Sequence, residues 1–140
     1  MATTIINHAS DLWNMLLEAE RAGVAVLGEL VPQAEDPSLR ELLKKFLKDE
    51  GVNCRILTTL IEHLGAEPSK ETGAFVGKVK ALGSLAEKVE LLIRGQEWVA
   101  RKIREFRHLL PAGSPHLFLE AIKVQHEENV DALKHAAGVR

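Results

Sequence analysis

The sequence predicts an all-α protein in which four long helices form a bundle, with a long crossover between the second and third helices. Apolar residues recur at alternating steps of three and four in four separate stretches, which is the spacing of a buried helix face. The composition is 46% hydrophobic with no Tyr, and it is rich in residues of high helix propensity. Because 140 residues suit one domain, we expect a single domain over residues 1–140.

The first two helices are expected over residues 10–31 and 37–65. Ser10 is the expected N-cap of the first helix. The pair Asp36 and Pro37 favours a helix start, since proline at the first helical position loses no needed hydrogen bond. Because the connection is only a few residues long, the two helices should be antiparallel neighbours. The second helix has the clearest buried face, formed by Leu39, Leu43, Phe46, Glu50, Asn53, Leu57, Leu60 and Leu64.

The chain over residues 65–83 becomes rich in Pro, Ser, Thr and Gly, which is typical of a connection. Its apolar piece, residues 75–82, could form a turn or two of helix. The second helix would be roughly 39 Å long, and a mostly extended crossover of about 18 residues spans that length. The second and third helices can therefore be parallel. A Ser-x-x-Glu capping box at residues 84–87 opens the third helix, and the fourth begins near Pro115 and ends before Gly138.

Each buried helix face is apolar except near its middle, where polar side chains take core positions. Counted from the turns, these positions are level within about one helical turn, roughly 5 Å. A carboxylate buried alone is costly unless it meets a cation, a proton or a metal. We therefore expect one polar layer, either a ligand set or a satisfied hydrogen-bond network. The first helix supplies Glu20, the second Glu50 and Asn53, the third Gln96, and the fourth His126 and Asn129.

Four helices with short first and third loops, a long crossover and mid-helix acidic residues resemble the ferritin-like superfamily. Its di-iron members take Glu from the first and third helices and Glu-x-x-His from the second and fourth. The segments LLEAERAGVAVL, LKDEGVNCRILTTLIEHLG and LLIRGQEWVARKIRE also resemble an uncharacterised family of bacterial ferritin-like proteins. The similarity spans residues 11–133. It implies an up-down-down-up bundle.

The resemblance carries over the metal ligands of that superfamily only in part. Glu20 matches the ligand of the first helix and Glu50 the first position of the second-helix motif, but Asn53 stands at the histidine position. Gln96 stands at the glutamate position of the third helix, unless the neighbouring Glu97 turns inward. The fourth helix has no Glu-x-x-His motif. Because amide oxygens are weak ligands for iron or manganese, an intact di-iron oxidase or ferroxidase centre is not expected.

Two interpretations of the polar layer stay open at this point. In the first, Glu20, Glu50 and His126 hold a single divalent ion such as Fe, Mn or Zn, and the three amide side chains are weak ligands or orient the ligands. In the second, the layer is a vestigial, metal-free core in which one glutamate is protonated or paired with His126, and the amides complete the hydrogen bonds.

The sequence also allows a non-enzymatic interaction or assembly module. Leu17, Val24 and Val31 give the first helix a second apolar edge, and the crossover carries the apolar residues 75–82. These two surfaces would bury a homodimer interface.

Bulk properties exclude several other classes of function. The net charge is −2 with acids and bases interspersed, so we expect no nucleic-acid or membrane partner. Cys54 is the single cysteine, and there is no signal peptide or membrane-length apolar stretch, so a reducing cytoplasm is the expected location. The sequence has no phosphate loop, dinucleotide fingerprint or zinc cysteine pair.

Overall fold

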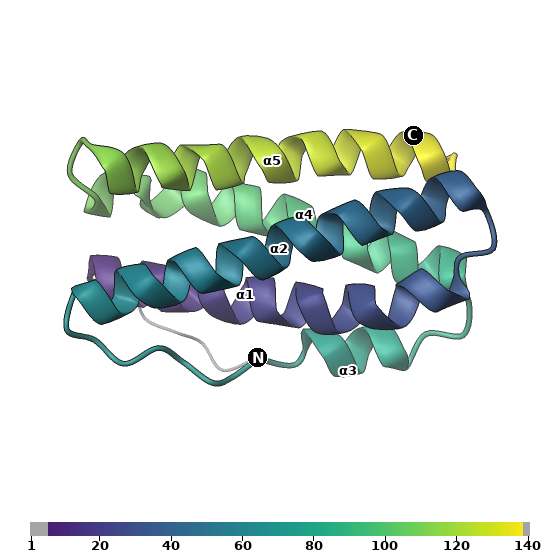
Figure 1. Cartoon of the computed structure of the whole chain (residues 1–140), viewed down its shortest axis with the longest axis horizontal. Helices are drawn as coiled ribbons and strands as arrows, with labels where there is room; N and C mark the ends of the chain where they lie inside the picture. Colours follow the sequence, from purple (N-terminus) through teal and green to yellow (C-terminus); the bar gives the residue numbers. More distant parts are fainter. Residues whose placement is uncertain (1–5, 139–140) are drawn as a thin grey trace.

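A computed structural model describes residues 6–138, and every regular element in this range is a helix (Figure 1). The prediction of an all-α protein is therefore confirmed. None of these helices is both long and apolar enough to span a membrane. Short 3-10 turns lie at Val31–Gln33 and at Arg107–Leu109. The helices are α1 (Ala9–Leu30), α2 (Pro37–His63), α3 (Phe75–Lys80), α4 (Leu85–Phe106) and α5 (Ser114–Ala137).

The four long helices lie alongside one another in two antiparallel pairs. Figure 1 shows α1 antiparallel to α2 and α4 antiparallel to α5, whereas α2 and α4 run in the same direction. After α2, residues 64–74 run back along the molecule to α3, which lies against α1. The crossover therefore returns the chain to the end where α2 began, which allows α2 and α4 to be parallel.

Local sequence sets the ends of the long helices. Asp36 Oδ2 accepts a hydrogen bond from the backbone N–H of Leu39 at 3.1 Å. Ser84 Oγ accepts one from the backbone N–H of Glu87 at 3.2 Å, which is the N-cap half of the predicted capping box. The other half differs, because Oε1 of Glu87 accepts from the hydroxyl of Ser84 at 2.9 Å and not from its backbone N–H. α5 ends at Ala137 and is followed by Gly138, whose φ of 68° is the left-handed conformation that glycine adopts without strain. These three predicted boundaries are confirmed.

The start of α1 corrects one prediction. Ser10 is not the N-cap, because the helix begins at Ala9 and His8 takes the N-cap position. Asp11 Oδ2 accepts hydrogen bonds from the backbone N–H groups of Asn7 and His8, at 3.1 and 3.0 Å. An acidic side chain in the first turn, rather than the serine hydroxyl, satisfies the amides at this end.

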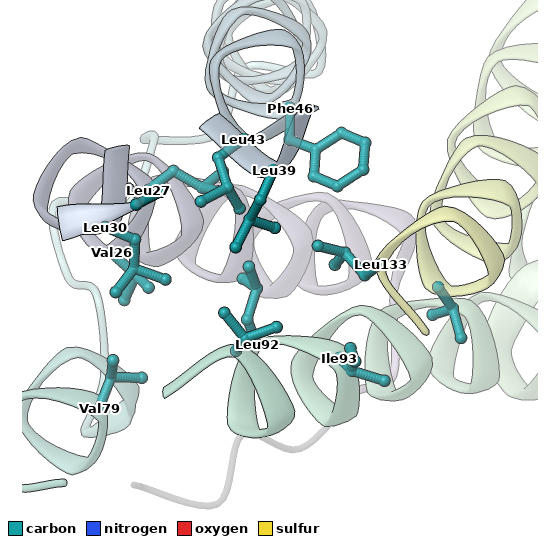
Figure 2. Close-up of a cluster of buried hydrophobic side chains, with 13 residues drawn as sticks. Val26, Leu27, Leu30, Leu39, Leu43, Phe46, Val79, Leu92, Ile93 and Leu133 are labelled. Atoms are coloured by element: carbon teal, nitrogen blue, oxygen red, sulfur yellow. The ribbon is translucent and has the colours of Figure 1, made fainter. Parts of the chain in front are cut away.

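The apolar core consists of two clusters, one toward each end of the long helices. Figure 2 shows the first cluster, where Leu27, Leu43, Leu92 and Leu133 come from the four long helices and Val79 of α3 lies at one edge. The second cluster joins the opposite halves of the same helices, and its members include Trp13, Leu57, Ile103 and Leu119. The polar positions predicted near the middle of each helix fall between these two clusters.

The buried face of α2 departs from the prediction near its C-terminal end. Leu60 is only half-buried and Leu64 is 54% exposed, although both are predicted core positions. Ile61 is fully buried and replaces them. A strict seven-residue repeat drifts by about 20° per heptad on a helix of 3.6 residues per turn, so after three heptads the buried face reaches Ile61 instead.

The crossover and α3 pack against α1 and α4 of the same chain. Phe75 lies against α4 at Gly95, where an added Cβ would be 2.8 Å from the ring. Val79 is 3% exposed and belongs to the first apolar cluster. The guanidinium of Arg21 on α1 donates to two backbone carbonyls of the crossover. The apolar piece proposed above for a homodimer interface is thus largely occupied within the chain, while a homodimer stays a prediction.

Candidate metal centre

The polar layer contains all six side chains that the sequence analysis selected. Their exposed fractions are between 0 and 5%, so they are fully inside the protein. All four long helices contribute to the layer, and the side chains are joined by hydrogen bonds across the helices. The members are Glu20 of α1, Glu50 and Asn53 of α2, Gln96 of α4, and His126 and Asn129 of α5.

Glu20 and His126 face each other directly. Nε2 of His126 lies 3.1 Å from Oε2 of Glu20, and Nδ1 lies 2.8 Å from the carbonyl oxygen of Ile122. Because a carbonyl oxygen only accepts, Nδ1 must carry a proton and donate. Nε2 then presents a lone pair to the carboxylate unless a second proton or a cation lies between them.

The charge on this pair follows from its partners. Burial raises the pKa of Glu20, but attraction to His126 and several hydrogen bonds outweigh burial and lower the pKa overall. Burial lowers the pKa of His126, but the charge of Glu20 and two hydrogen bonds raise it overall. Without a metal, the pair is therefore a carboxylate and an imidazolium.

Glu50 has an incomplete set of partners. Its Oε1 accepts a hydrogen bond from Nε2 of Gln96 at 3.1 Å and lies 4.0 Å from Nε2 of His126. Its Oε2 is buried and receives no hydrogen bond from any residue in the described range. Burial, followed by the charge of Glu20, raises the pKa of Glu50 well above its usual range. This carboxyl group therefore needs a proton or a cation.

The amide side chains hold the two carboxylates in position. Nδ2 of Asn53 donates to Oε1 of Glu20 at 2.8 Å. Nδ2 of Asn129 donates to Oε1 of Gln96 at 3.2 Å, and Nε2 of Gln96 in turn donates to Oε1 of Glu50. The amides contact the carboxylates through their nitrogen atoms, so they orient the acidic groups rather than add oxygen ligands.

Two further residues of this region have a role that the sequence analysis did not assign to them. Oε1 of Gln125 accepts a second hydrogen bond from Nδ2 of Asn53, at 2.8 Å. Gln125 lies four residues before Asn129, and this spacing was the available signal that the two share a helix face. The second is Gly23 of α1: a Cβ there would lie 2.4 Å from Oε1 of Glu50, so the carboxylate rests directly against the α1 backbone.

The donor set fits one divalent ion. Glu20, Glu50 and His126 each offer one ligand atom, and the three atoms lie within 4.8 Å of one another. An ion about 2.1 Å from each ligand places ligand atoms about 3 to 4 Å apart. Nε2 of His126 lies 3.1 Å from Oε2 of Glu20 and 4.0 Å from Oε1 of Glu50, which matches this range. Two carboxylates and one imidazole suit Zn, Fe or Mn.

The same residues do not fit two ions. Gln96 is 3% exposed and takes the core position on α4. Glu97 does not turn inward, because its carboxylate lies 3.8 Å from the ammonium of Lys134 at the surface. The layer therefore offers two carboxylates and one imidazole, fewer anionic ligands than the four that a di-iron centre of the kind described above uses.

Cys54 does not extend the donor set. The thiol is half-buried, and burial followed by the charge of Glu20 raises its pKa to about 11. It is therefore a neutral thiol at physiological pH, which is a poor metal ligand and a poor nucleophile.

Comparison with known families gives a match. A family model described as a domain of unknown function, DUF6306, matches residues 8–135, which include every residue of the polar layer. The chain therefore belongs to this family. Comparison with curated proteins and with solved structures gives no match.

Proposed function

We propose that this DUF6306 protein is a ferritin-like bundle protein that binds one divalent metal ion between Glu20, Glu50 and His126. The observation that carries the proposal is the buried Oε2 of Glu50, which no donor among residues 6–138 reaches. Beside it, Oε2 of Glu20 lies 3.1 Å from Nε2 of His126, the ring nitrogen that does not donate to Ile122. One divalent ion would satisfy all three side chains at once.

Several features support the ferritin-like part of the proposal. α1 and α2 are antiparallel, α4 and α5 are antiparallel, and a long crossover makes α2 and α4 parallel. This is the order expected of an up-down-down-up bundle. Glu20 and Glu50 also stand near the middle of the first and second long helices, as the metal ligands of that superfamily do.

The chain's own residues would prepare the centre for an ion. Asn53 and Gln96 hold the carboxylates of Glu20 and Glu50 by hydrogen bonds. The carbonyl of Ile122 keeps the proton of His126 on Nδ1, which leaves Nε2 available as a ligand. The two apolar clusters exclude water from both ends of the layer. A bound ion would act as a Lewis acid with positions left open for water or a small ligand.

Metal content is the direct test. Protein purified without a histidine tag should contain, or take up, about one equivalent of Zn, Mn or Fe. At a free-ion concentration 100-fold above Kd, the free energy of unfolding should rise by about 2.7 kcal/mol. Elemental analysis and thermal denaturation with each ion measure these two effects. Absence of both a stoichiometric ion and a thermal shift would refute the proposal.

A pair of matched variants makes this test specific. Glu50→Gln should abolish metal uptake and the thermal shift while the helical circular dichroism spectrum is kept, because glutamine has the shape of the protonated acid. Glu97→Gln changes the same residue type at the surface of α4 and should bind metal like the wild type. Equal metal binding by both variants would show that the ion lies elsewhere.

The second candidate is a metal-free polar core in a protein that acts as an interaction or assembly module. The observation that favours it is the raised pKa of Glu50, because the network closes if this group keeps its proton. Glu50→Gln should then be as stable as the wild type or more stable, with or without metal. Light scattering across protein concentration tests the assembly part, and a monomer at the highest concentration would remove it.

A further inference from the structure

A groove of about 700 Å³ runs between α2 and α5, directly outside the polar layer. Leu42 and Phe46 of α2 form one wall, and α5 forms the other. The α5 wall includes Leu117 and Val124, which are 70% and 45% exposed. The groove also contains Gln125 and Asn129, the two amide side chains of α5 that belong to the hydrogen-bond network.

These two amides connect the groove to both carboxylates of the layer. Gln125 accepts from Asn53, and the same Asn53 nitrogen donates to Glu20. Asn129 donates to Gln96, which donates to Glu50. The groove therefore reaches the hydrogen-bond partners of the proposed ligands without crossing either apolar cluster.

Two other sides of the layer and both of its ends are closed. On the α1 side, the backbone at Gly23 is so near Glu50 that even a Cβ would lie 2.4 Å from Oε1. On the α4 side, the ring of Phe75 covers Gly95, the residue next to Gln96. A Cβ added to Gly95 would lie 2.8 Å from this ring. The two apolar clusters cover the layer along the helix axes.

We infer that the α2–α5 groove is the access route by which a divalent cation reaches the centre, and that the side chain of Gln125 opens and closes it. This inference rests on the proposed function. Gln125 is half-buried, and its hydrogen bond to Asn53 is made at the edge of the layer rather than inside it. Rotation of this one side chain breaks one neutral hydrogen bond and leaves the ligands in place.

The chemistry of the groove suits a cation. Amide carbonyl oxygens such as those of Gln125 and Asn129 replace water around hard divalent ions at modest cost. The rim carries the carboxylates of Asp49, Glu120 and Glu128 and the ammonium of Lys45. Lys45 pairs with Asp49 at 3.2 Å and Arg107 pairs with Glu120 at 3.1 Å, whereas Glu128 is in no ion pair within residues 6–138 and adds a negative charge to the same groove as the two amides.

The rate of metal exchange tests the route. The protein is loaded with Zn²⁺ alone, because an N/O site that binds Mn or Fe also binds Zn, which stands higher in the affinity order. Release to excess chelator and uptake from a chromophoric chelator are followed by stopped flow. Gln125→Ala removes the side chain that closes the groove, and uptake and release should both accelerate, about fivefold to tenfold.

A blocking variant gives the opposite change. Ala121 lines the groove one turn before Gln125, so Ala121→Trp should fill it and slow both rates at least about fivefold, with Kd nearly unchanged because the ligands are untouched. Ala25→Trp places the same side chain on the exposed surface of α1, outside the groove, and should exchange Zn²⁺ like the wild type.

The outcomes separate the two proposals. If the wild type binds Zn²⁺ and Ala121→Trp exchanges it as fast as Ala25→Trp, the access route is wrong and the metal centre stands. If the wild type takes up no metal in this or the stoichiometry experiment, the metal centre is wrong and the route falls with it. Should Gln125→Ala fail to fold, Ala121→Trp against Ala25→Trp still decides the route.

Discussion

Gly23→Ala is the substitution that most directly probes how tightly the polar layer is built. The new methyl carbon would lie 2.4 Å from Oε1 and 2.9 Å from the carboxyl carbon of Glu50, whereas ordinary contacts begin near 3.4 Å. The carboxylate therefore has to move by roughly 1 Å. It is 1% exposed and hydrogen-bonded to Gln96, so moving it disturbs its neighbours.

The expected size of the effect is a difference between two contributions. Alanine in a helix interior is favoured over glycine by about 0.8 to 1 kcal/mol. Overpacking of a close-packed core costs about 1 to 3 kcal/mol. Gly28→Ala on the same helix supplies the control, because a Cβ there meets nothing within 4 Å and the position is exposed. Gly28→Ala should be stabilised by about 0.8 to 1 kcal/mol, and Gly23→Ala should be less stable than Gly28→Ala by about 1 to 3 kcal/mol.

Urea denaturation of the metal-free proteins measures this difference, and a Zn²⁺ titration measures the second consequence. Because the displaced oxygen belongs to a proposed ligand, Gly23→Ala should also weaken Zn²⁺ binding, while Gly28→Ala should not. If the two variants were equally stable and bound Zn²⁺ equally, the contact between the α1 backbone and Glu50 would not constrain the layer, and the reasoning would be refuted.

Three further predictions concern pH, α3 and the crossover. Folded metal-free protein keeps protons on Glu50 and His126 that the unfolded chain releases above about pH 4.5 and 6.5, so its stability should fall as pH rises through these ranges, by at most about 1.4 kcal/mol per pH unit for each proton. Urea denaturation from pH 5 to 8 checks this, and the slope should be smaller in Glu50→Gln; a stability that rises with pH would contradict it. Gly95→Ala would press on the ring of Phe75 and should detach α3, seen as faster proteolysis of α3 but not of α5; equal cleavage of the variant and the wild type would show that the contact is dispensable. Arg21→Ala removes the donor to two crossover carbonyls and should accelerate hydrogen exchange over residues 67–74 without changing Zn²⁺ binding; unchanged exchange there would mean that the guanidinium does not fasten the crossover.

The members of the polar layer could be predicted because each one interrupts a regular apolar pattern. A Glu, Gln or His at a core position of a long helix is unusual. Counting residues from the turns gives the height of each such position along the bundle to within about one helical turn. Glu20, Glu50, Gln96 and His126 were found in this way, and the structure brings them into contact. The sequence did not decide whether Gln96 or Glu97 faces the core. The rotation of α4 about its axis decides this, and it turns Glu97 toward Lys134 at the surface.

The sequence pattern does not predict the roles of Gly23, Gln125 and Asp11, because these roles depend on small interatomic distances. The contact of Gly23 with Glu50 requires the separation of α1 and α2 to a fraction of an ångström. Gln125 is adjacent to the buried face rather than on it, and its role exists only because α2 and α5 leave a groove beside it. At the start of α1, N-cap preferences alone point to Ser10, but the side chain of Asp11 accepts the hydrogen bonds. Serine and aspartate both suit this end of a helix, so the sequence alone does not choose between them.

The polar layer also determines how the two antiparallel helix pairs can slide along each other. Leucine-rich surfaces fit one another almost equally well after a shift of one helical turn, so apolar side chains alone specify the alignment weakly. A shift of the α4–α5 pair by one turn would set Gln96 and His126 against leucines and would leave Glu20 and Glu50 without partners. These few polar groups therefore specify the axial alignment of the two helix pairs, and they would do so whether or not an ion ever binds.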